Sequence, residues 1–248
     1  SGTFGFGIEY KDFLDLNQVG AIISKGLTPV PRAGNKGVRI AETPAGMLNC
    51  IGLENPGIDK FLTDILPQVR KEASETAFIA NFSAGTVEDY GMMAAKLDVD
   101  GVDGVEVNIS CPNVKEGGIA FGQNPDALYE ITKAIKAKAK QPIVMKLSPN
   151  VTDITEMAKA AEAGGCDALS LINTITGMKI DIHRRKFVLA NKTGGMSGPA
   201  IKPVAVRMVY QVSHACKLPI IGMGGILTGE DAIEMMMAGA TMVSVGTA

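Results

Sequence analysis

Short apolar runs alternate with amphipathic segments along most of this chain. The apolar runs contain almost no polar alternation, which is typical of parallel strands that are covered on both faces. They predict strands at residues 20–25, 77–82, 104–109, 142–147, 167–172, 218–222 and 241–245. The segments between them repeat apolar residues at three or four positions, which indicates helices with one buried face. These helices are expected at residues 10–19, 56–71, 87–97, 126–138, 153–163, 201–215 and 230–238.

Four stretches do not follow this alternation. Residues 28–46 are rich in proline and glycine and predict little regular structure, and residues 46–53 predict a compact turn. Residues 173–198 predict a long loop, and loops of this length are usually lids or binding segments. The glycine-rich residues 114–122 predict another loop, directly behind the strand at 104–109.

The regular alternation of strand and helix predicts one α/β domain over residues 1–248, with the architecture of a (β/α)8 TIM barrel. Seven strands are expected, and a helix precedes the first of them. Both features fit a barrel whose first strand lies upstream of Ser1, within roughly 20 further residues. A helical segment is expected beyond Ala248 for the same reason. A doubly wound sheet is the alternative fold, but it does not require a helix ahead of its first strand.

Composition and charge fit a soluble protein whose partners are neither nucleic acid nor a membrane. The 248 residues are 46% hydrophobic and 20% charged, with a formal net charge of -2, so the chain carries no strong field that would attract a polyanion. No apolar run reaches the roughly 18 residues of a membrane span, and no signal peptide is visible. The cysteines at positions 50, 111, 166 and 216 are widely spaced, which argues against a metal or iron–sulfur site built by this chain alone. We therefore expect a reducing, cytoplasmic setting.

The strand at 104–109 leads into a thiol between two carboxamides, in the stretch Asn108-Ile109-Ser110-Cys111-Pro112-Asn113. Pro112 favours an extended backbone at Cys111 and marks the end of regular structure. The Cys111 thiol can serve as a base or a nucleophile, and Asn108 and Asn113 can hydrogen-bond a planar polar ligand. A small buried cysteine in a turn is the alternative, but the loop behind it favours a functional site.

Further candidates lie at the carboxyl ends of other predicted strands, which form the active face of a barrel. Lys25 and Lys146 each end an apolar strand, where a cation costs free energy unless a polar ligand meets it. They could stabilise negative charge that forms on a ligand, and a lysine whose stem is buried and whose ammonium reaches water is the alternative. Asn49, Asn81 and Asn173 add neutral donors and acceptors around the same mouth.

Two glycine turns follow the last two strands, at Gly222-Met223-Gly224-Gly225-Ile226 and Gly246-Thr247. Glycine lets backbone N–H groups approach a phosphate, and barrels bind phosphates at these two turns. Glycines that only make tight turns are the alternative. Gly194-Gly195 and Ser197-Gly198 could complete the phosphate site.

Long, ordered motifs make this chain resemble the dihydroorotate dehydrogenases over its whole length. The motifs lie at residues 1–5, 24–26, 49–57, 108–122, 144–150, 172–174, 198–203 and 222–226. The resemblance implies FMN bound on a barrel and oxidation of (S)-dihydroorotate to orotate in pyrimidine biosynthesis. Cys111 resembles the soluble class 1 enzymes, because the membrane-associated class has serine there. Residues 114–122 are similar to the B-type, which implies a homodimer core and a second subunit that carries FAD and a 2Fe–2S cluster and passes electrons to NAD.

The resemblance also implies a role for each candidate residue. Cys111 would take the proton from C5 of the substrate while hydride leaves C6 for flavin N5, and Lys146 would stabilise the negative charge of the reduced flavin. Lys25 would contact both flavin and substrate. The other FMN contacts would be Ser1, Asn81, Asn108, Ile172, Gly198, Gly224, Gly225, Gly246 and Thr247. The other substrate contacts would be Asn49, Cys50, Ile51, Gly52, Leu53, Asn108, Asn113, Asn173 and Thr174.

Three other functions remain open at the level of sequence. A dihydropyrimidine dehydrogenase barrel shares the cysteine chemistry, but its loop differs and it belongs to a much larger chain. A flavin-free barrel that acts on a phosphorylated substrate would use the same two glycine turns. A non-catalytic fragment would lack dihydroorotate turnover even when it is supplied with FMN.

Overall fold

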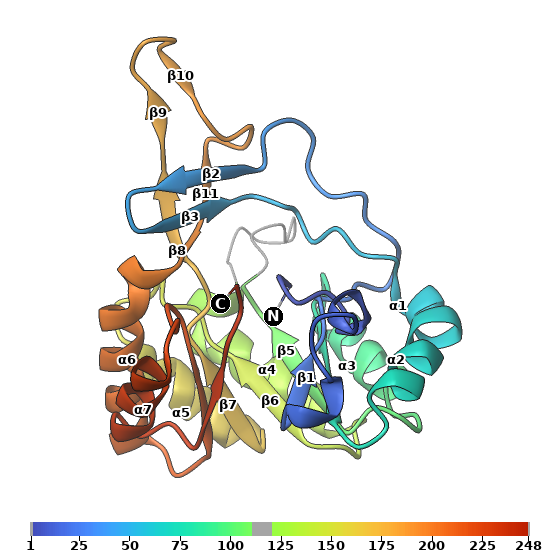
Figure 1. Cartoon of the computed structure of the whole chain (residues 1–248). Helices are drawn as coiled ribbons and strands as arrows, with labels where there is room; N and C mark the ends of the chain where they lie inside the picture. The colour runs from blue at the N-terminus through green and yellow to red at the C-terminus, as the bar shows by residue number, and fades with distance from the viewer. Residues whose placement is uncertain (1, 111–120, 248) are drawn as a thin grey trace.

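A curled parallel sheet forms the centre of the computed structural model, which describes residues 2–110 and 121–247 (Figure 1). Its seven strands are ordered β1-β4-β5-β6-β7-β12-β13. Because this order follows the chain without reversal, the sheet lacks the switch point of a doubly wound fold. The predicted barrel-type α/β fold is confirmed. The strands are β1 (Ala21–Ile23), β4 (Ala77–Phe82), β5 (Gly104–Asn108), β6 (Ile143–Lys146), β7 (Ala168–Leu171), β12 (Ile220–Met223) and β13 (Met242–Ser244).

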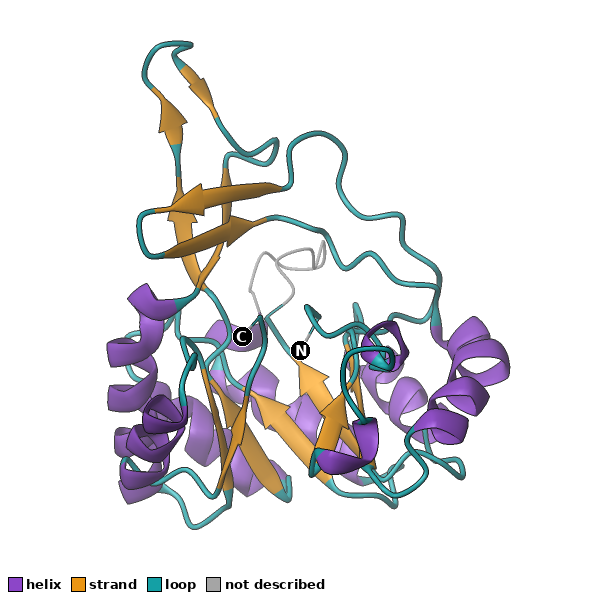
Figure 2. Cartoon of the chain, in the orientation of Figure 1, coloured by secondary structure: helices purple, strands orange, loops and turns teal. Residues whose placement is uncertain are grey.

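Helices cover the convex face of this sheet (Figure 2). Four of them are preceded by an N-cap residue whose side chain accepts a hydrogen bond from a backbone N–H of the first turn. These N-cap residues are Thr86, Asn124, Asp153 and Thr228. The predicted helices at these places are therefore confirmed, with ends shifted by a residue or two. The helical segments are α1 (Ile58–Lys60), the π-helical turn η3 (Phe61–Ile65), α2 (Leu66–Glu72), α3 (Val87–Lys96), α4 (Pro125–Lys136), α5 (Ile154–Gly164), α6 (Lys202–Ala215) and α7 (Gly229–Met237).

Alternate residues of the central strands face opposite sides of the sheet. In β5, Val105 and Val107 lie in the core beneath the helices, so Glu106 between them faces the interior of the curled sheet. Lys146 in β6 and Ser170 in β7 are also buried and face the same interior. The expectation that these strands contain almost no polar alternation is therefore wrong at their interior-facing positions.

A second, antiparallel sheet lies across the carboxyl ends of the central strands (Figure 1). This covering sheet has the order β2-β3-β11-β8. It corrects three predictions, because the segments expected as irregular chain, compact turn and long loop contain paired strands. A two-stranded hairpin of β9 and β10 extends from it. The bounds are β2 (Ile40–Thr43), β3 (Gly46–Asn49), β8 (Ile175–Met178), β9 (Ile180–Asp181), β10 (Lys186–Phe187) and β11 (Thr193–Ser197).

Two features stabilise the covering sheet: a small hydrophobic core of its own and glycines that let its backbone segments approach closely. Ala41, Leu48 and Leu189 form a hydrophobic cluster that is separate from the main core. A side chain at Gly194 would place its Cβ 2.5 Å from the Asn49 carbonyl oxygen, and one at Gly195 would contact the Thr174 hydroxyl. The glycines therefore let β11 pack against its neighbours.

The segment ahead of the first strand differs from its prediction as a helix over 10–19. It folds into two short 3₁₀ turns, η1 (Ile8–Tyr10) and η2 (Leu16–Gln18). The Asp15 side chain accepts a hydrogen bond from Asn17 N and starts the second turn separately, since aspartate competes with continued helix by bonding its local backbone. Two further 3₁₀ turns are η4 (Phe121–Gln123) and η5 (Pro199–Ile201). No helix in the described part of the chain is long and apolar enough to cross a membrane.

Candidate active site

The predicted site residues gather at the carboxyl ends of the parallel strands. Lys25 follows β1, Asn81 lies near the end of β4, Asn108 and Lys146 end β5 and β6, and Asn173 follows β7. The glycine turns 224–225 and 246–247 follow β12 and β13. The strand register therefore brings these positions to one mouth. Three predicted residues, Ser1, Cys111 and Asn113, lie outside the described residues.

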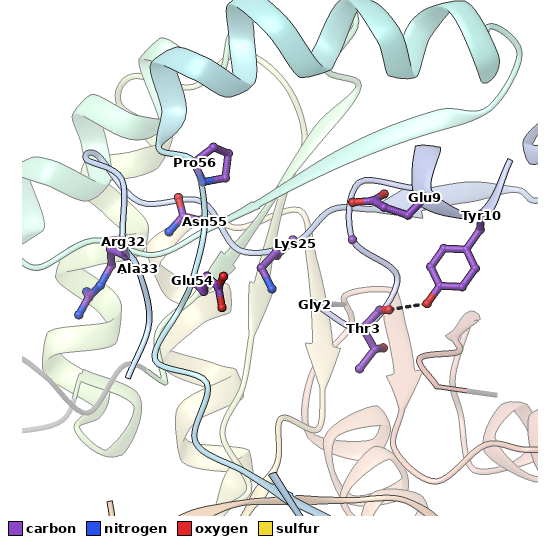
Figure 3. A pocket seen from close by; sticks show the side chains of 11 residues that line it. Gly2, Thr3, Glu9, Tyr10, Lys25, Arg32, Ala33, Glu54, Asn55 and Pro56 are labelled. Carbon is purple, nitrogen blue, oxygen red and sulfur yellow. Dashed lines mark hydrogen bonds between the residues drawn. The ribbon is translucent and has the colours of Figure 1, made fainter. Parts of the chain in front are cut away.

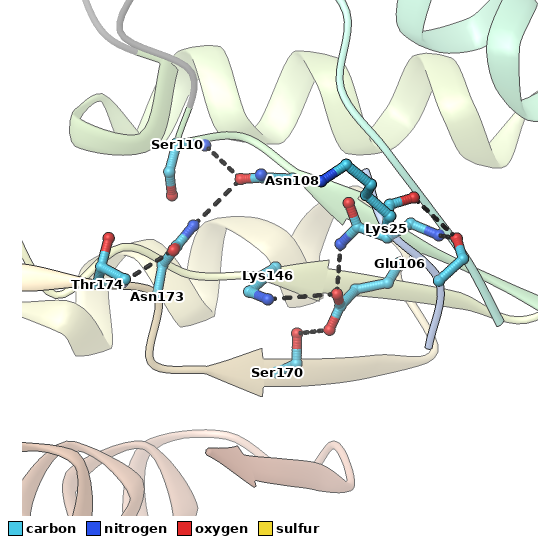
Figure 4. A network of polar contacts seen from close by, with 10 residues as sticks. Lys25, Glu106, Asn108, Ser110, Lys146, Ser170, Asn173 and Thr174 are labelled. Atoms are coloured by element: carbon cyan, nitrogen blue, oxygen red, sulfur yellow. Dashed lines mark hydrogen bonds and ion pairs between the residues drawn. The ribbon is translucent and has the colours of Figure 1, made fainter. Parts of the chain in front are cut away.

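A buried polar network crosses four neighbouring strands below this mouth (Figure 4). At its centre the fully buried Glu106 carboxylate accepts hydrogen bonds from Asn81 Nδ2 at Oε2 and from Ser170 Oγ at Oε1, the latter at 2.7 Å. The Lys146 ammonium is 3.5 Å from Glu106 Oε2, and its side chain is 7% exposed. The cation that the sequence placed at the end of an apolar strand thus already has a counter-charge from the neighbouring strand.

The charge state of Glu106 follows from these contacts. Burial by itself would raise the pKa of this carboxyl group, but the Lys146 ammonium and the hydrogen bonds from Ser170 and Asn81 hold the pKa below its ordinary value. The network therefore contains an ionised carboxylate beside an ammonium group.

A row of amide groups lies next to this network, at the entrance to the segment that contains Cys111. Asn108 Oδ1 accepts hydrogen bonds from Asn173 Nδ2 at 3.2 Å and from Ser110 N at 3.1 Å. The Tyr90 hydroxyl donates to the Asn108 carbonyl oxygen at 2.9 Å. The Asn173 side chain in turn accepts a bond from Thr174 N. These bonds fix Asn108 and Asn173 side by side.

Lys25 borders a cavity of about 550 Å³ (Figure 3). Polar side chains of Glu9, Tyr10, Arg32 and Glu54 line it as well. Among the described residues, no hydrogen bond or ion pair to the Lys25 ammonium is found, and Lys25 forms part of the cavity wall. The cavity reaches Lys25 but not Lys146, because Lys146 is buried against Glu106 deeper in the sheet.

The predicted substrate segment 49–53 leaves the covering sheet and crosses to the barrel mouth. Asn49 Nδ2 donates to the Gly195 carbonyl oxygen at 3.3 Å, and Asn35 Nδ2 donates to the Cys50 carbonyl oxygen at 2.9 Å. A side chain at Gly26 would place its Cβ 2.9 Å from Asn81 Oδ1 and 3.6 Å from Leu53. Gly26 therefore allows this segment, Lys25 and the buried network to approach one another.

Glycines form a close meeting of backbone segments at the other end of the mouth. Gly198, Gly224 and Gly225 have φ values of 102°, 120° and 74°, which favour glycine. A Cβ at Gly225 would lie 2.8 Å from the Gly198 carbonyl oxygen and 3.0 Å from Lys202 N. The structure thus brings Gly198 next to the glycine turn at 224–225. Gly194 and Gly195 pair with β8 in the covering sheet, and their part in a phosphate site stays a prediction.

Sequence reasoning missed Glu106, Ser170 and Tyr90. The pattern around Glu106 predicts an apolar strand, although a glutamate two positions before Asn108 faces the same side of that strand. That spacing was the available signal. The partners Asn81, Lys146 and Ser170 come from three other strands, so only the sheet register reveals them.

Fold and geometry together define an α/β barrel-type protein with polar side chains gathered at the carboxyl ends of its strands, the face on which barrels carry their sites. Residues 1–248 match the family model described as dihydroorotate dehydrogenase, and the chain belongs to this family. The resemblance stated from the sequence motifs is therefore confirmed.

Three curated relatives illustrate this membership. The chain is 62% identical over 248 residues to the "Dihydroorotate dehydrogenase B (NAD(+)), catalytic subunit" of Lachnoclostridium phytofermentans, covering 100% of this chain and 82% of the relative. Proteins with the same description from a Geobacter species and from Alkaliphilus oremlandii are each 59% identical, covering all of this chain and 81% and 82% of theirs. Among solved structures, the crystal structure of the Amycolatopsis orientalis BexX/CysO complex matches with a TM-score of 0.50 and 15% identity, over 96% of this chain and 73% of that chain. That similarity concerns the fold alone.

Proposed function

We propose that this chain oxidises (S)-dihydroorotate to orotate in pyrimidine biosynthesis, with FMN at the barrel mouth. The observation that carries the proposal is the juxtaposition of Lys146, Asn108 and Asn173 at one mouth in a chain of the dihydroorotate dehydrogenase family. The family relatives described as catalytic subunits agree with it.

The residues at the mouth fit FMN. Gly198, Gly224 and Gly225 have positive φ angles and pack so closely against their neighbours that a Cβ would meet other atoms of the chain, and a compact glycine turn of this kind suits a phosphate approached by backbone N–H groups. Ser110 Oγ is buried and lacks a hydrogen-bond partner among the described residues, so a bound ligand would satisfy it. The residues proposed to hold FMN are Ser1, Lys25, Asn81, Asn108, Lys146, Ile172, Gly198, Gly224, Gly225, Gly246 and Thr247.

FMN, when bound, supplies a two-electron acceptor for the hydride that leaves C6 of dihydroorotate. The Lys146 ammonium favours the negative charge that reduction adds. Lys25, on the wall of the 550 Å³ cavity, would contact both cofactor and substrate. The side chains of Asn49, Asn108 and Asn173 bind the carboxylate and ring of the substrate through donors and acceptors.

Cys111 is proposed as the base that takes the C5 proton, and Asn113 as a further substrate contact. Both residues lie outside the described residues. Support comes from the segment that leads to Cys111, because Asn108 is held by Tyr90 and Asn173. The remaining proposed substrate contacts are Cys50, Ile51, Gly52, Leu53 and Thr174.

A second subunit is proposed to carry FAD and a 2Fe–2S cluster and to pass electrons to NAD, with a homodimer of this chain as the core. The curated relatives are described as catalytic subunits of NAD(+)-linked enzymes, which supports such a partner. The wide spacing of the four cysteines supports it further, because an iron–sulfur cluster is usually held by four thiolates brought together.

The test is an anaerobic titration of the purified chain. We expect the protein to bind FMN, to release FMN on denaturation, and to lose the absorbance of oxidised flavin when (S)-dihydroorotate is added. The (R)-enantiomer is the control and should leave the absorbance unchanged. A protein that takes up no flavin even after incubation with FMN would overturn the proposal.

A further inference from the structure

Glu106 is the buried charge that the proposed chemistry does not use. Its side chain is fully buried, and an ionised carboxylate in such a place is costly unless it is paired and hydrogen-bonded. The cost is met by donors from three other strands, since Asn81 lies on β4, Lys146 on β6 and Ser170 on β7. Such a convergence requires an explanation beyond sheet formation, because backbone bonds already join these strands.

The contacts of Glu106 connect it with two residues proposed to touch the flavin. Its Oε2 atom accepts the hydrogen bond from Asn81 and also faces the Lys146 ammonium at 3.5 Å. The same oxygen therefore limits the rotamers of both side chains. Ser170 Oγ, 2.7 Å from Oε1, fixes the carboxylate itself. A change at Glu106 would reach the mouth through Asn81 and Lys146.

The charge of Glu106 has a second consequence. An unbalanced ammonium in a low-dielectric interior strongly favours an added negative charge nearby, whereas an ammonium beside a carboxylate presents a nearly neutral pair to its surroundings. Lys146 is buried and lies beside Glu106. The electrostatic effect of Lys146 on a ligand at the mouth is therefore set by the pair and not by the lysine alone.

On the basis of the proposed function, we propose that Glu106 is a positioning residue that fixes Lys146 and Asn81 and balances the lysine charge, and so sets the preference of the site for reduced over oxidised flavin. The alternative is that Glu106 only holds the sheet together. The positioning role and the purely structural role predict different affinities of the site for reduced and oxidised flavin. A measurement of stability alone would not separate the two roles.

The test replaces Glu106 by glutamine, which keeps the shape of the side chain and removes its charge. With Lys146 no longer balanced, the ratio of reduced to oxidised flavin affinity should rise about tenfold, a positive shift of about 30 mV for a two-electron couple. The ratio is measured by equilibrating the FMN-loaded protein with a reference redox dye at neutral pH and recording both spectra. If Glu106 only holds the sheet, the melting temperature falls and the ratio stays that of the unsubstituted protein.

The matched control is Asp103→Asn. This substitution also removes one negative charge, at a residue just ahead of the same strand. The Asp103 carboxylate pairs with Arg70 and accepts a hydrogen bond from Phe78 N, at the end of the sheet opposite the mouth. The substitution should lower stability and leave the flavin ratio unchanged. Glu106→Asp is a second variant in case the glutamine variant misfolds. It keeps the carboxylate but moves it away from Lys146, so it should shift the ratio of reduced to oxidised flavin affinity in the same direction by a smaller factor.

These outcomes separate the inference from the proposed function. An unchanged ratio in both Glu106 variants, or an equal shift in Asp103→Asn, would overturn the positioning role. FMN that binds but is not reduced by dihydroorotate would overturn the proposed reaction alone, since the redox dye still reports the ratio. Failure of the unsubstituted protein to bind FMN would overturn both.

Discussion

Lys146 and Glu106 share the interior of the curled sheet, and neither charge acts independently of the other. Their side chains are 7% and 0% exposed. Removing one partner of a buried pair typically costs about 3–5 kcal/mol, because the other charge is left unpaired. A substitution of Lys146 would therefore disturb folding as well as any bound flavin. Residue-scale experiments at this site need readouts that separate the two effects.

The first residue-scale prediction concerns Cys111. Cys111→Ala should leave FMN binding nearly unchanged and slow flavin reduction by dihydroorotate at neutral pH by a factor of ~10² to 10⁴, the usual contribution of a positioned base. Cys111→Ser should recover activity only at higher pH, because a hydroxyl is the poorer base. Single-turnover absorbance measurements under anaerobic conditions give the rate. Unchanged reduction in the alanine variant would remove Cys111 from the mechanism.

The described cysteines supply a control for this experiment. Burial, with Glu162 nearby, raises the pKa of the Cys216 thiol to about 11. Burial and the neighbouring Asp167 raise the pKa of Cys166 to about 12. Neither thiol is ionised to a useful extent at neutral pH. In the Cys216→Ala variant, dihydroorotate should therefore reduce the bound flavin at the same rate as in the unsubstituted protein.

At the scale of elements, the covering sheet is the part of the molecule that carries residues from distant segments to the mouth. Its pairing of β3 with β11 joins residues 47–49 to residues 195–197. Asn49 is held at one end of this pairing by its bond to the Gly195 carbonyl oxygen. The position of the proposed substrate contacts thus depends on how well this sheet is packed.

The second prediction tests that dependence with Leu48→Ala. Leu48 is 2% exposed in the small core of the covering sheet, and a buried leucine truncated to alanine typically costs about 2–5 kcal/mol. We expect faster hydrogen exchange at residues 40–49 and 193–197 and weaker binding of dihydroorotate. FMN affinity should change less, because Gly224 and Gly225 follow a strand of the central sheet. Hydrogen exchange and substrate titration of the loaded protein provide the measurements.

Leu128→Ala is the matched control for this experiment. Leu128 lies on the buried face of α4, in the main core, so its truncation should lower global stability without a selective loss of substrate affinity. If both variants weaken dihydroorotate binding equally, the covering sheet has no special role in placing the substrate contacts.

The central sheet could be predicted from the sequence because each of its strands is a local apolar run. The strand at Ala77–Phe82, for example, has the predicted bounds. The covering sheet could not be predicted, because its strands are short, three of the four contain glycine, and β11 pairs with β3 from a distant part of the chain. The role of Glu106 could not be predicted for a related reason. Its partners Asn81, Lys146 and Ser170 are close only after four strands align.

At the scale of the whole molecule, the mouth lies between two sheets that are built from interleaved parts of the chain (Figure 1). The central sheet contributes charge and amide groups, and the covering sheet contributes the segment after Asn49. Under the proposed function, flavin and substrate would share this mouth. Electrons held by a flavin at this mouth would have to leave for another acceptor before the next turnover.

The last prediction concerns that acceptor. The isolated, FMN-loaded chain should oxidise dihydroorotate with an artificial dye as acceptor but should reduce NAD only when a second polypeptide is added. The physical reason is that Cys50, Cys166 and Cys216 lie far apart in sequence, with burial raising the pKa of the last two, whereas an iron–sulfur relay needs thiolates gathered around the metal. The measurement is the steady-state rate of dihydroorotate oxidation with dye, NAD or fumarate as acceptor. Each rate is determined with and without the FAD-containing subunit. NAD reduction by this chain alone at the rate seen with the dye would contradict the two-subunit proposal, and rapid turnover with fumarate would indicate an A-type enzyme instead.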